Sequence, residues 1–484
     1  MAIQKLITFP VIIFAGILCC NCGPESDDDG FLPPVTEVPD ADLPEVTTYL
    51  TTPNRSSEFA LFENNISAFR ESNEATIEIN EATSFQEIDG FGFALTGGSA
   101  LHLMEMSQAK RSELLNELFG NAANDINMNF IRISLGSSDL DPSVFTYNDD
   151  PDDPDHSGFD LGRDKENLLP VLKEIIAINP DIKILASPWS APAWMKSNNS
   201  SVGGSLLQEY YDSYALYFDK YIAVMAEEGI VISHLTIQNE PLNPYNNPSM
   251  YMTAGEQTDF IRDHLGPLLR QNNRSVKIIA YDHNPDVIEY PLEVLEDTEA
   301  AAYIDGSAFH LYAGSITALS TVKNRFPEKN IYFTEQWFSA SGTFEEDLKW
   351  HTREVVIGSL RNWSRCVIEW NLTSDLSFDP HTDGGCDSCK GGLTLTGNNV
   401  VRNAGYFVIS HASKLIVPGS RRIQSSLPGP LPNVAFITPA NEIVLLVLNN
   451  SDRRQTFNIT QGESKFATAL DEGAVATYKW KLND

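Results

Sequence analysis

Basic side chains are scarce in this sequence. Of its 484 residues, 33 are Lys or Arg and 66 are Asp or Glu, which gives a formal net charge of −33 at pH 7. A chain with this charge repels polyanions, so the composition argues against nucleic acid or an anionic membrane surface as a partner. An uncharged ligand such as a sugar is compatible with it.

The apolar run near the N-terminus is too short to cross a bilayer. It covers residues 7–20, "ITFPVIIFAGILCC", which is the length of a signal-peptide core. Its end, "ILCCNCG", resembles the lipobox of bacterial lipoproteins, with Ile17 three places before Cys20. We therefore expect residues 1–20 to be a signal peptide and Cys20 to carry the lipid. An ordinary cleaved signal is the alternative, and Cys19, in the small-residue position, leaves the choice of cysteine open.

The segment that follows has few apolar residues. Residues 21–47 are rich in Pro and Asp and cannot bury enough surface to fold, so we expect a disordered tether. "SDDD" close behind Cys20 resembles the surface-export signal of Bacteroidetes lipoproteins. These features predict an exported lipoprotein of the cell surface or periplasm, held at the outer membrane only by its lipid.

Cysteine is sparse outside this region. Of six cysteines, only Cys366, Cys386 and Cys389 lie beyond the signal and the tether. A lone "CDSC" without a second pair lacks the spacing of a zinc site, and an exported protein favours a small structural disulfide between Cys386 and Cys389. Unpaired thiols and a metal site are the alternatives. We expect no metal and no organic cofactor.

Eight short apolar runs alternate with helical patterns such as "QAKRSELLNELFG" and "KENLLPVLKEIIAIN". Repeated strand and helix units predict an α/β fold, and eight of them favour a closed (β/α)₈ barrel over residues 86–414. A doubly wound open sheet is the alternative. The runs are "EIDGFGFAL", "MNFIRISL", "DIKILASP", "SHLTIQ", "VKIIAYD", "IDGSAFHLY", "KNIYFTE" and "RCVIEWNL".

The pattern changes after about residue 415. Strand-like segments such as "ANEIVLLVLNNS" and "RQTFNITQ" are joined by turn residues with no helix between them, and "TIEINEATSFQEIDG" before the barrel has the same alternation. We expect residues 48–85 and 415–484 to combine into one β-sandwich beside the barrel.

Two carboxylates follow barrel strands directly. Glu240 comes after the fourth run, in "TIQNEP", and Glu335 after the seventh. Catalytic residues of parallel barrels collect at the carboxyl ends of the strands, and we expect strands four and seven to face each other across the ring. Pro241 should keep Glu240 extended. Two facing carboxyl groups suit glycosidic hydrolysis, with retention at about 5 Å separation and inversion at about 6.5–9.5 Å.

Several motifs together resemble glycoside hydrolase family 30, the glucosylceramidase-like glycosidases. They are "DGFGFALTGGSA", "IRISLGSSD", "ASPWSAPAWMK", "TIQNEP", "FHLY", "IYFTEQW" and "IEWNL". They occur in order from about residue 85 onward. The family implies a (β/α)₈ barrel with a split sandwich and hydrolysis through a covalent glycosyl-enzyme.

The resemblance also implies roles for single residues. Glu240 matches the general acid and base, and Glu335 the nucleophile. Arg132 matches the arginine beneath the nucleophile, where its charge would favour the ionised form of Glu335. Substrate-binding positions are matched by Asp139, Trp189, Asn239, His310, Tyr312 and Trp370.

The substrate expected from the resemblance is a β-glucoside. The "HTDGGCDSCKGG" loop is similar to the bacterial branches of the family, which favours β-1,6-glucan or its oligosaccharides. Glucosylceramide-type β-glucosidase action is the first alternative, followed by β-xylosidase or β-fucosidase action. A non-catalytic glycan-binding lipoprotein and a metal hydrolase using Asp282, His283 and His310 are alternatives of other classes. We expect a monomer by default.

Overall fold

The structure is a computed structural model that describes residues 43–482. The expected signal peptide, the lipidation at Cys20 and most of the expected tether lie outside the described residues. The last residues of that tether belong to the fold: strand β1 begins at Thr47, and Val46 is 1% exposed in the core of the sandwich. The disordered tether predicted over 21–47 is therefore wrong for residues 43–47, because apolar side chains there find a core to pack into.

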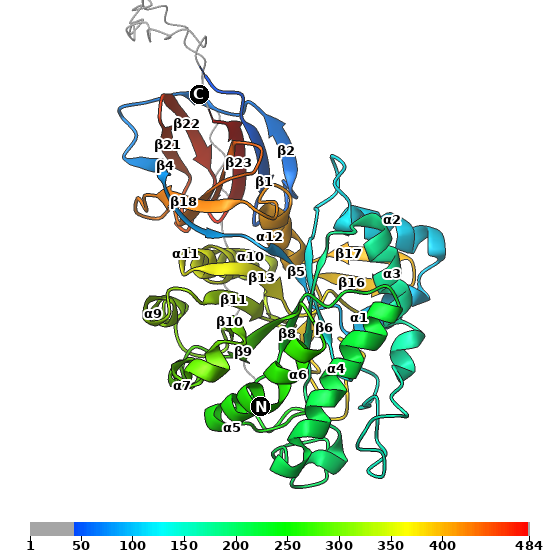
Figure 1. The fold of residues 1–484 in the computed structure, drawn as a ribbon. Coiled ribbons are helices and arrows are strands. Elements are labelled where there is room, and N and C mark those ends of the chain that lie inside the picture. Colours follow the sequence, from blue (N-terminus) through cyan, green and yellow to red (C-terminus); the bar gives the residue numbers. More distant parts are fainter. Residues whose placement is uncertain (1–42, 483–484) are drawn as a thin grey trace, which may run out of the picture. The chain divides into compact units, whose positions relative to one another are not determined.

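Eight parallel strands form the barrel, and each lies within one of the eight expected runs or extends at most one residue beyond it (Figure 1). They are β5 (Gly90–Phe93), β6 (Phe130–Ser134), β7 (Lys183–Ser187), β8 (His234–Thr236), β9 (Lys277–His283), β10 (Ile304–His310), β11 (Asn330–Glu335) and β13 (Ser364–Glu369). Their order is β5-β13-β11-β10-β9-β8-β7-β6. A bridge between Ala94 and Arg132 joins the two ends of this order, so the ring closes as predicted.

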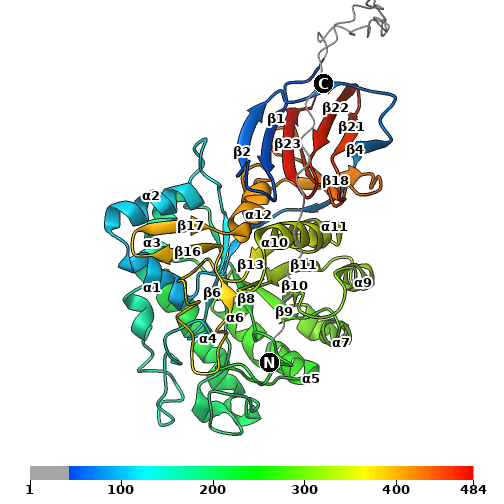
Figure 2. The ribbon, with the colours of Figure 1, turned by 180° about the vertical axis from the view of Figure 1, so that it is seen from behind.

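Helices surround the barrel and cover its outer face (Figures 1 and 2). The segments expected to be helical form α2 and α3, whose buried sides carry mainly leucine and isoleucine. The helices are α1 (Gly97–Glu105), α2 (Gln108–Phe119), α3 (Leu168–Ile178), α4 (Tyr211–Glu227), α5 (Ala254–Asp259), α6 (Gly266–Gln271), α7 (Glu289–Glu296), α8 (Thr298–Ala301), α9 (Ala318–Arg325), α10 (Phe344–Trp350), α11 (Ser359–Arg361) and α12 (Ala404–Ser413). π-helical turns at Phe260–Leu265 and His351–Gly358 connect α5 to α6 and α10 to α11.

The inside of the barrel is layered. An apolar layer is made of Phe130, Leu185, Ile279, Ala308, Tyr332, Cys366 and Ile368. Side chains two positions apart on a strand point to the same face. Two residues beyond members of this layer come Arg132, Ser187, His310 and Thr334, which form a polar layer linked by hydrogen bonds through Asp282. The strand sequences thus place a polar layer above the apolar layer, at the carboxyl end of the barrel.

The β-sandwich is built from both ends of the described chain, as predicted. Its strands follow the order β2-β1-β23-β20-β19-β18-β4-β21-β22-β3. The N-terminal ones are β1 (Thr47–Thr51), β2 (Ala60–Glu63), β3 (Ser67–Ala68) and β4 (Ala75–Glu87). The C-terminal ones are β18 (Arg421–Ser425), β19 (Asn433–Ile437), β20 (Glu442–Leu448), β21 (Gln455–Gln461), β22 (Ser464–Leu470) and β23 (Val475–Lys481).

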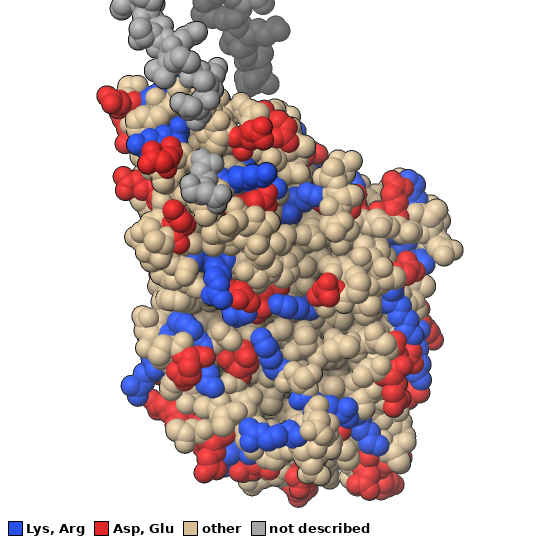
Figure 3. All heavy atoms as spheres, turned by 45° about the horizontal axis from the view of Figure 1, so that its top comes forward, with Lys and Arg blue, Asp and Glu red and all other residues tan. Residues whose placement is uncertain are grey.

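Two small sheets lie in the loops after β11 and β13. One pairs β12 (Phe338–Ser339) with β15 (Cys389–Lys390), and the other contains β14 (Thr373–Ser374), β16 (Leu393–Thr396) and β17 (Asn399–Arg402). Across residues 43–482, none of the helices combines the length and the apolar character that a membrane span requires. Acidic and basic side chains are interspersed on the face drawn in Figure 3. On this face neither sign of charge is gathered into one patch.

Candidate active site

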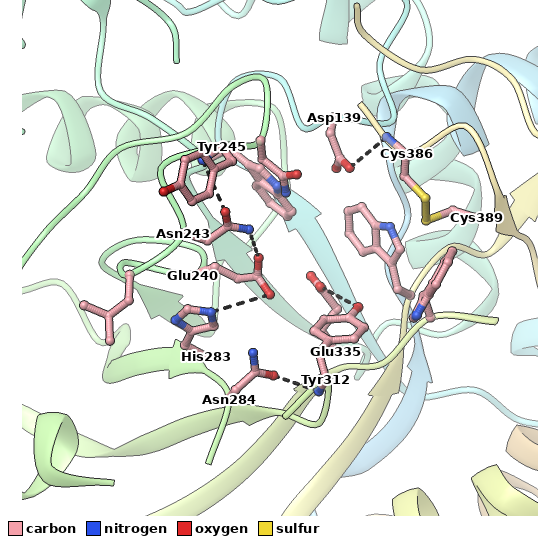
Figure 4. A pocket seen from close by; sticks show the side chains of 15 residues that line it. Asp139, Glu240, Asn243, Tyr245, His283, Asn284, Tyr312, Glu335, Cys386 and Cys389 are labelled. Carbon is pink, nitrogen blue, oxygen red and sulfur yellow. Dashed lines mark hydrogen bonds and ion pairs between the residues drawn. A yellow bond between two sulfur atoms is a disulfide. The ribbon is translucent and has the colours of Figure 1, made fainter. Parts of the chain in front are cut away.

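A cavity of about 500 Å³ opens at the carboxyl end of the barrel strands (Figure 4). Six of the predicted site residues line it: Asp139, Trp189, Glu240, Tyr312, Glu335 and Trp370. The other three are buried: Arg132 and His310 bond to the two glutamates, and Asn239 accepts a hydrogen bond from Arg132. The structure thus brings all nine together, six at the surface of the cavity and three behind it.

Glu240 and Glu335 lie close together. One carboxylate oxygen of each, and a ring nitrogen of His310, all lie within 4.8 Å of one another. The expectation that strands four and seven face each other is wrong, because β8 and β11 are separated by only β9 and β10 in the ring. The side chains converge because both point into the mouth, and His310, from β10, lies between them: its Nδ1 is 3.1 Å from Glu240 Oε1 and 3.4 Å from Glu335 Oε1.

The backbone at Glu240 is not extended, contrary to the expectation from Pro241. Strand β8 ends at Thr236, and Glu240 has a φ of 45°, in the left-handed region. This conformation is unfavourable for a residue with a Cβ and is found where the surroundings impose it, often at functional sites. The Glu240 N–H donates to the Asp282 carbonyl at 3.0 Å, and Asn243 N–H donates to the Glu240 carbonyl at 2.8 Å. The tertiary hydrogen bond to Asp282 thus overrides the local preference before proline.

Arg132 connects the carboxylates beneath the cavity. Its guanidinium donates to Glu335 Oε2, to Asn239 Oδ1 at 2.7 Å and to Asp282 Oδ2 at 2.9 Å. It also lies 4.8 Å from the ring centre of Trp189. A buried arginine is tolerated only when its charge and its donors are satisfied. The same contacts fix the orientation of Glu335 and of the Asn239 side chain.

His310 has a carboxylate at each ring nitrogen. Its Nε2 is 3.2 Å from Asp282 Oδ1, and its Nδ1 faces Glu240. Burial opposes the ring's charge, but Glu335, Asp282 and Glu240 outweigh it and raise the pKa of His310 to about 10. Burial alone would raise the pKa of Glu240. His310, His283 and Asn243 outweigh this effect and hold the pKa below its usual value.

Part of the cavity wall is aromatic. Trp189 and Trp370 stack with ring centres 5.3 Å apart, and the disulfide between Cys386 and Cys389 also lines the cavity. Asp139 stands at this wall, where its Oδ2 accepts the Cys386 N–H at 3.4 Å (Figure 4). Burial, then the charges of Glu335 and Glu240, raise the pKa of Asp139 to about 7. Such a group is partly protonated at neutral pH and both donates and accepts hydrogen bonds.

Several lining residues were not predicted from the sequence. Asn243 donates to Glu240 Oε2 at 2.8 Å, and His283 has Nε2 4.0 Å from Glu240 Oε1. Asn284 accepts the Tyr312 N–H at 2.7 Å, and Tyr312 donates to Glu335 Oε1 at 2.9 Å. The nearness of Asn243 and His283 to strand ends was the available signal. Leu242, Tyr245, Asn246 and Trp337 also line the cavity.

Glu240, His310 and Glu335 have a spacing that a metal ion could occupy. Their bonding does not favour this use. Arg132 already neutralises Glu335, and an imidazolium with a carboxylate at each nitrogen has no lone pair for a metal. The arrangement is therefore better suited to acid and base chemistry by carboxylates.

The comparisons with known proteins agree with this geometry. The family model of the glycosyl hydrolase family 30 TIM-barrel domain matches residues 88–416, and that of the family 30 beta sandwich domain matches residues 419–478. An endo-1,6-beta-D-glucanase of Aspergillus fumigatus is 34% identical over 71% of this chain and 73% of its own length. The lysosomal acid glucosylceramidase of Mus musculus is 27% identical over 82% of each chain.

Solved structures give the same result. An endo-beta-1,6-glucanase structure superposes with a TM-score of 0.85 at 34% identity, covering 91% of this chain and 100% of that one. The match includes both the barrel and the sandwich, since it extends over nearly all described residues. The chain therefore belongs to glycoside hydrolase family 30.

Proposed function

We propose that this glycoside hydrolase is a retaining enzyme that cleaves β-1,6-linked glucan, with Glu335 as the nucleophile and Glu240 as the general acid and base. The observation that carries the mechanism is the separation of the two carboxylates, an oxygen of each lying within 4.8 Å. Retaining glycosidases hold their carboxyl groups about 5–5.5 Å apart, whereas inverting ones need about 6.5–9.5 Å to admit a water.

Glu335 is suited to attack the anomeric carbon. Arg132 and Tyr312 each donate to one of its oxygens, which holds the carboxylate in a single orientation and stabilises its negative charge. In the first step a Glu335 oxygen bonds to the anomeric carbon while the glycosidic bond breaks. In the second step water bonds to that carbon and the Glu335 carboxylate leaves, so the configuration is retained overall.

Glu240 exchanges the proton. It must protonate the departing oxygen in the first step and remove a proton from water in the second. In the free enzyme this proton is held by the pair of Glu240 and His310, whose facing atoms are 3.1 Å apart. Its transfer from His310 Nδ1 to Glu240 produces the general acid without any change in the total number of protons.

The linkage is supported by the relatives. Proteins described as endo-1,6-beta-D-glucanases are 32–34% identical to this chain, and the solved endo-beta-1,6-glucanase covers both domains. The glucosylceramidases that we compared are more distant, at 26–28% identity. We therefore favour the glucan over the glycolipid.

The substrate can be tested by incubating the protein in parallel with pustulan, a linear β-1,6-glucan, with glucosylceramide, and with aryl β-glucoside, β-xyloside and β-fucoside. We expect soluble β-1,6-gluco-oligosaccharides from pustulan. Cleavage of glucosylceramide but not of pustulan would show that the substrate is the glycolipid. No cleavage of any of them would favour a glycan-binding protein.

The roles of the two glutamates can be tested with Glu335→Gln, which should lower kcat on pustulan on the order of 10³-fold or more. Glu369→Gln is the matched control, because Glu369 also ends a barrel strand but bonds to His351 instead of lining the cavity. With azide and an aryl β-glucoside, Glu335→Gly should yield the α-azide and Glu240→Gly the β-azide. The opposite stereochemistry would reverse the roles.

A further inference from the structure

The loop after β8 carries an unusually exposed aromatic side chain. Tyr245 is 85% exposed, more than any other large apolar or aromatic residue in 43–482, yet it lines the cavity. An exposed aromatic ring on a glycosidase cavity offers an apolar face on which a sugar ring can stack. None of the roles given above uses it.

This loop is held in place. Asn243 Oδ1 accepts the Tyr245 N–H at 3.2 Å, while Asn243 Nδ2 donates to Glu240 Oε2 at 2.8 Å (Figure 4). Two residues beyond Tyr245, the Asn247 side chain donates to the Asp383 carbonyl at 2.8 Å and accepts from Ser201 at 3.1 Å. The aromatic ring is therefore carried by a backbone that is fixed relative to Glu240.

Its position indicates which part of the substrate it meets. Tyr245 lies on the side of the cavity that carries Asn243 and Glu240, across from Asp139 and Cys386, and the carboxylates of Glu240 and Glu335 lie lower in the view (Figure 4). In the proposed mechanism Glu240 protonates the leaving oxygen, so the sugar nearest the loop that carries Glu240 is the one that departs. The aromatic wall with Asp139 then holds the sugar that becomes covalently bound.

We propose that Tyr245 forms a binding subsite for the glucosyl unit on the leaving-group side of the scissile bond, with its ring stacked on the apolar face of that sugar. The inference rests on the proposed retaining β-glucanase function. A 1,6-linkage has an extra rotatable bond through the exocyclic carbon, so ordering the departing sugar costs more conformational entropy than at a ring-to-ring linkage. A fixed aromatic platform next to the acid offsets part of that cost. Asn246, which also lines the cavity, provides an amide beside it.

The test isolates this subsite from the rest of the reaction. Incubation with 2-deoxy-2-fluoro-β-glucosyl fluoride should trap Glu335 as a stable ester with release of fluoride, leaving the leaving-group side empty. Gentiobiose added afterwards binds there, and its hydroxyl attacks the anomeric carbon as the ester bond to Glu335 breaks. Glu240 takes the hydroxyl proton, the free Glu335 carboxylate is restored, and the enzyme regains activity. The half-saturating gentiobiose concentration for reactivation is measured for wild type, Tyr245→Ala and Tyr245→Phe.

We expect Tyr245→Ala to raise this concentration roughly 5- to 10-fold, the size of a lost stacking contact, and Tyr245→Phe to leave it nearly unchanged. Tyr251→Ala, which removes a partly exposed tyrosine outside the cavity, should behave as wild type. If Tyr245→Ala has the same half-saturating gentiobiose concentration as the wild type, the proposed subsite is wrong. The trapped ester would still support the proposed function. Failure to trap wild type would instead overturn the proposed function, and the subsite with it.

Discussion

At the scale of single residues, Asp139 is the cavity group whose charge responds to neutral pH. Burial and the charges of Glu335 and Glu240 raise its pKa to about 7 from an ordinary value of 3.8. The folded protein therefore binds this proton more tightly than the unfolded chain. Its contribution to stability is complete below about pH 4 and is lost as the pH rises through 7.

Replacing Asp139 by asparagine removes this dependence, because the amide resembles the protonated acid at every pH. We compare the free energy of unfolding of Asp139→Asn with that of the wild type by urea denaturation at pH 5 and at pH 8. The difference should be about 2 kcal/mol more favourable to the variant at pH 8 than at pH 5. Asp141→Asn is the control: the pKa of Asp141 is raised to about 6 by burial, so its gain should be smaller. Equal effects of Asp139→Asn at both pH values would contradict the assignment.

The sequence could predict which residues meet at the mouth, but not how they are bonded. Glu240 and Glu335 follow strands in recognisable motifs, and the strand periodicity places Arg132 and His310 on the inner face. The left-handed backbone at Glu240 depends on a hydrogen bond to Asp282, 42 residues away along the chain. Local preference could not reveal it, because the decisive contact is tertiary.

At the scale of elements, residues 382–390, here called the clasp, connect three loops around the cavity. Thr382 N–H donates to the Asp139 carbonyl at 2.8 Å, and the Thr382 hydroxyl donates to the Asn247 carbonyl. At the other end, β15 pairs with β12 after β11. A Cβ on Gly385 would lie 2.4 Å from the Asp139 carbonyl oxygen, so the clasp packs closely there. The Cys386–Cys389 disulfide holds the clasp in this shape.

We expect the double variant Cys386→Ser/Cys389→Ser to bind substrate less well while the chemistry is preserved. Asp139 would lose the Cys386 N–H that positions it, so KM on pustulan should rise roughly 5-fold with kcat changed less than about 2-fold. The small loop limits the loss of stability to about 2 kcal/mol, seen as a lower Tm. A lower Tm with unchanged KM would show that the disulfide serves stability alone.

Elements were predicted better than their connections. Eight strands, α2, α3 and the sandwich strands follow from apolar periodicity, which the core enforces. The clasp has no such periodicity, and its hydrogen bonds to Asn247 join segments more than 130 residues apart. The spacing of Cys386 and Cys389 suggested a disulfide but gave no sign that it lines the cavity.

At the scale of the whole molecule, one hydrophobic cluster spans the barrel and one face of the sandwich, which also has a core of its own. A single cluster of buried side chains includes Phe407 and Ile409 of α12 together with Val434 and Phe436 of β19. His411 of α12 joins both ends of the chain: its ring nitrogens lie 3.0 Å from the Thr477 hydroxyl and 2.9 Å from the Thr51 hydroxyl. Residues 43–482 accordingly belong to one compact unit.

This shared cluster predicts that the two domains unfold together. Calorimetry of the protein should show one transition whose calorimetric and van't Hoff enthalpies agree, because separating the domains would expose core side chains of both. A fragment limited to residues 88–416 should fail to fold, since it lacks the sandwich strands that cover α12, and should bind a hydrophobic dye such as ANS strongly. Two resolved transitions, or a fragment with native near-ultraviolet circular dichroism, would show that the barrel is stable alone. In that case the sandwich would have to be retained for a reason other than folding.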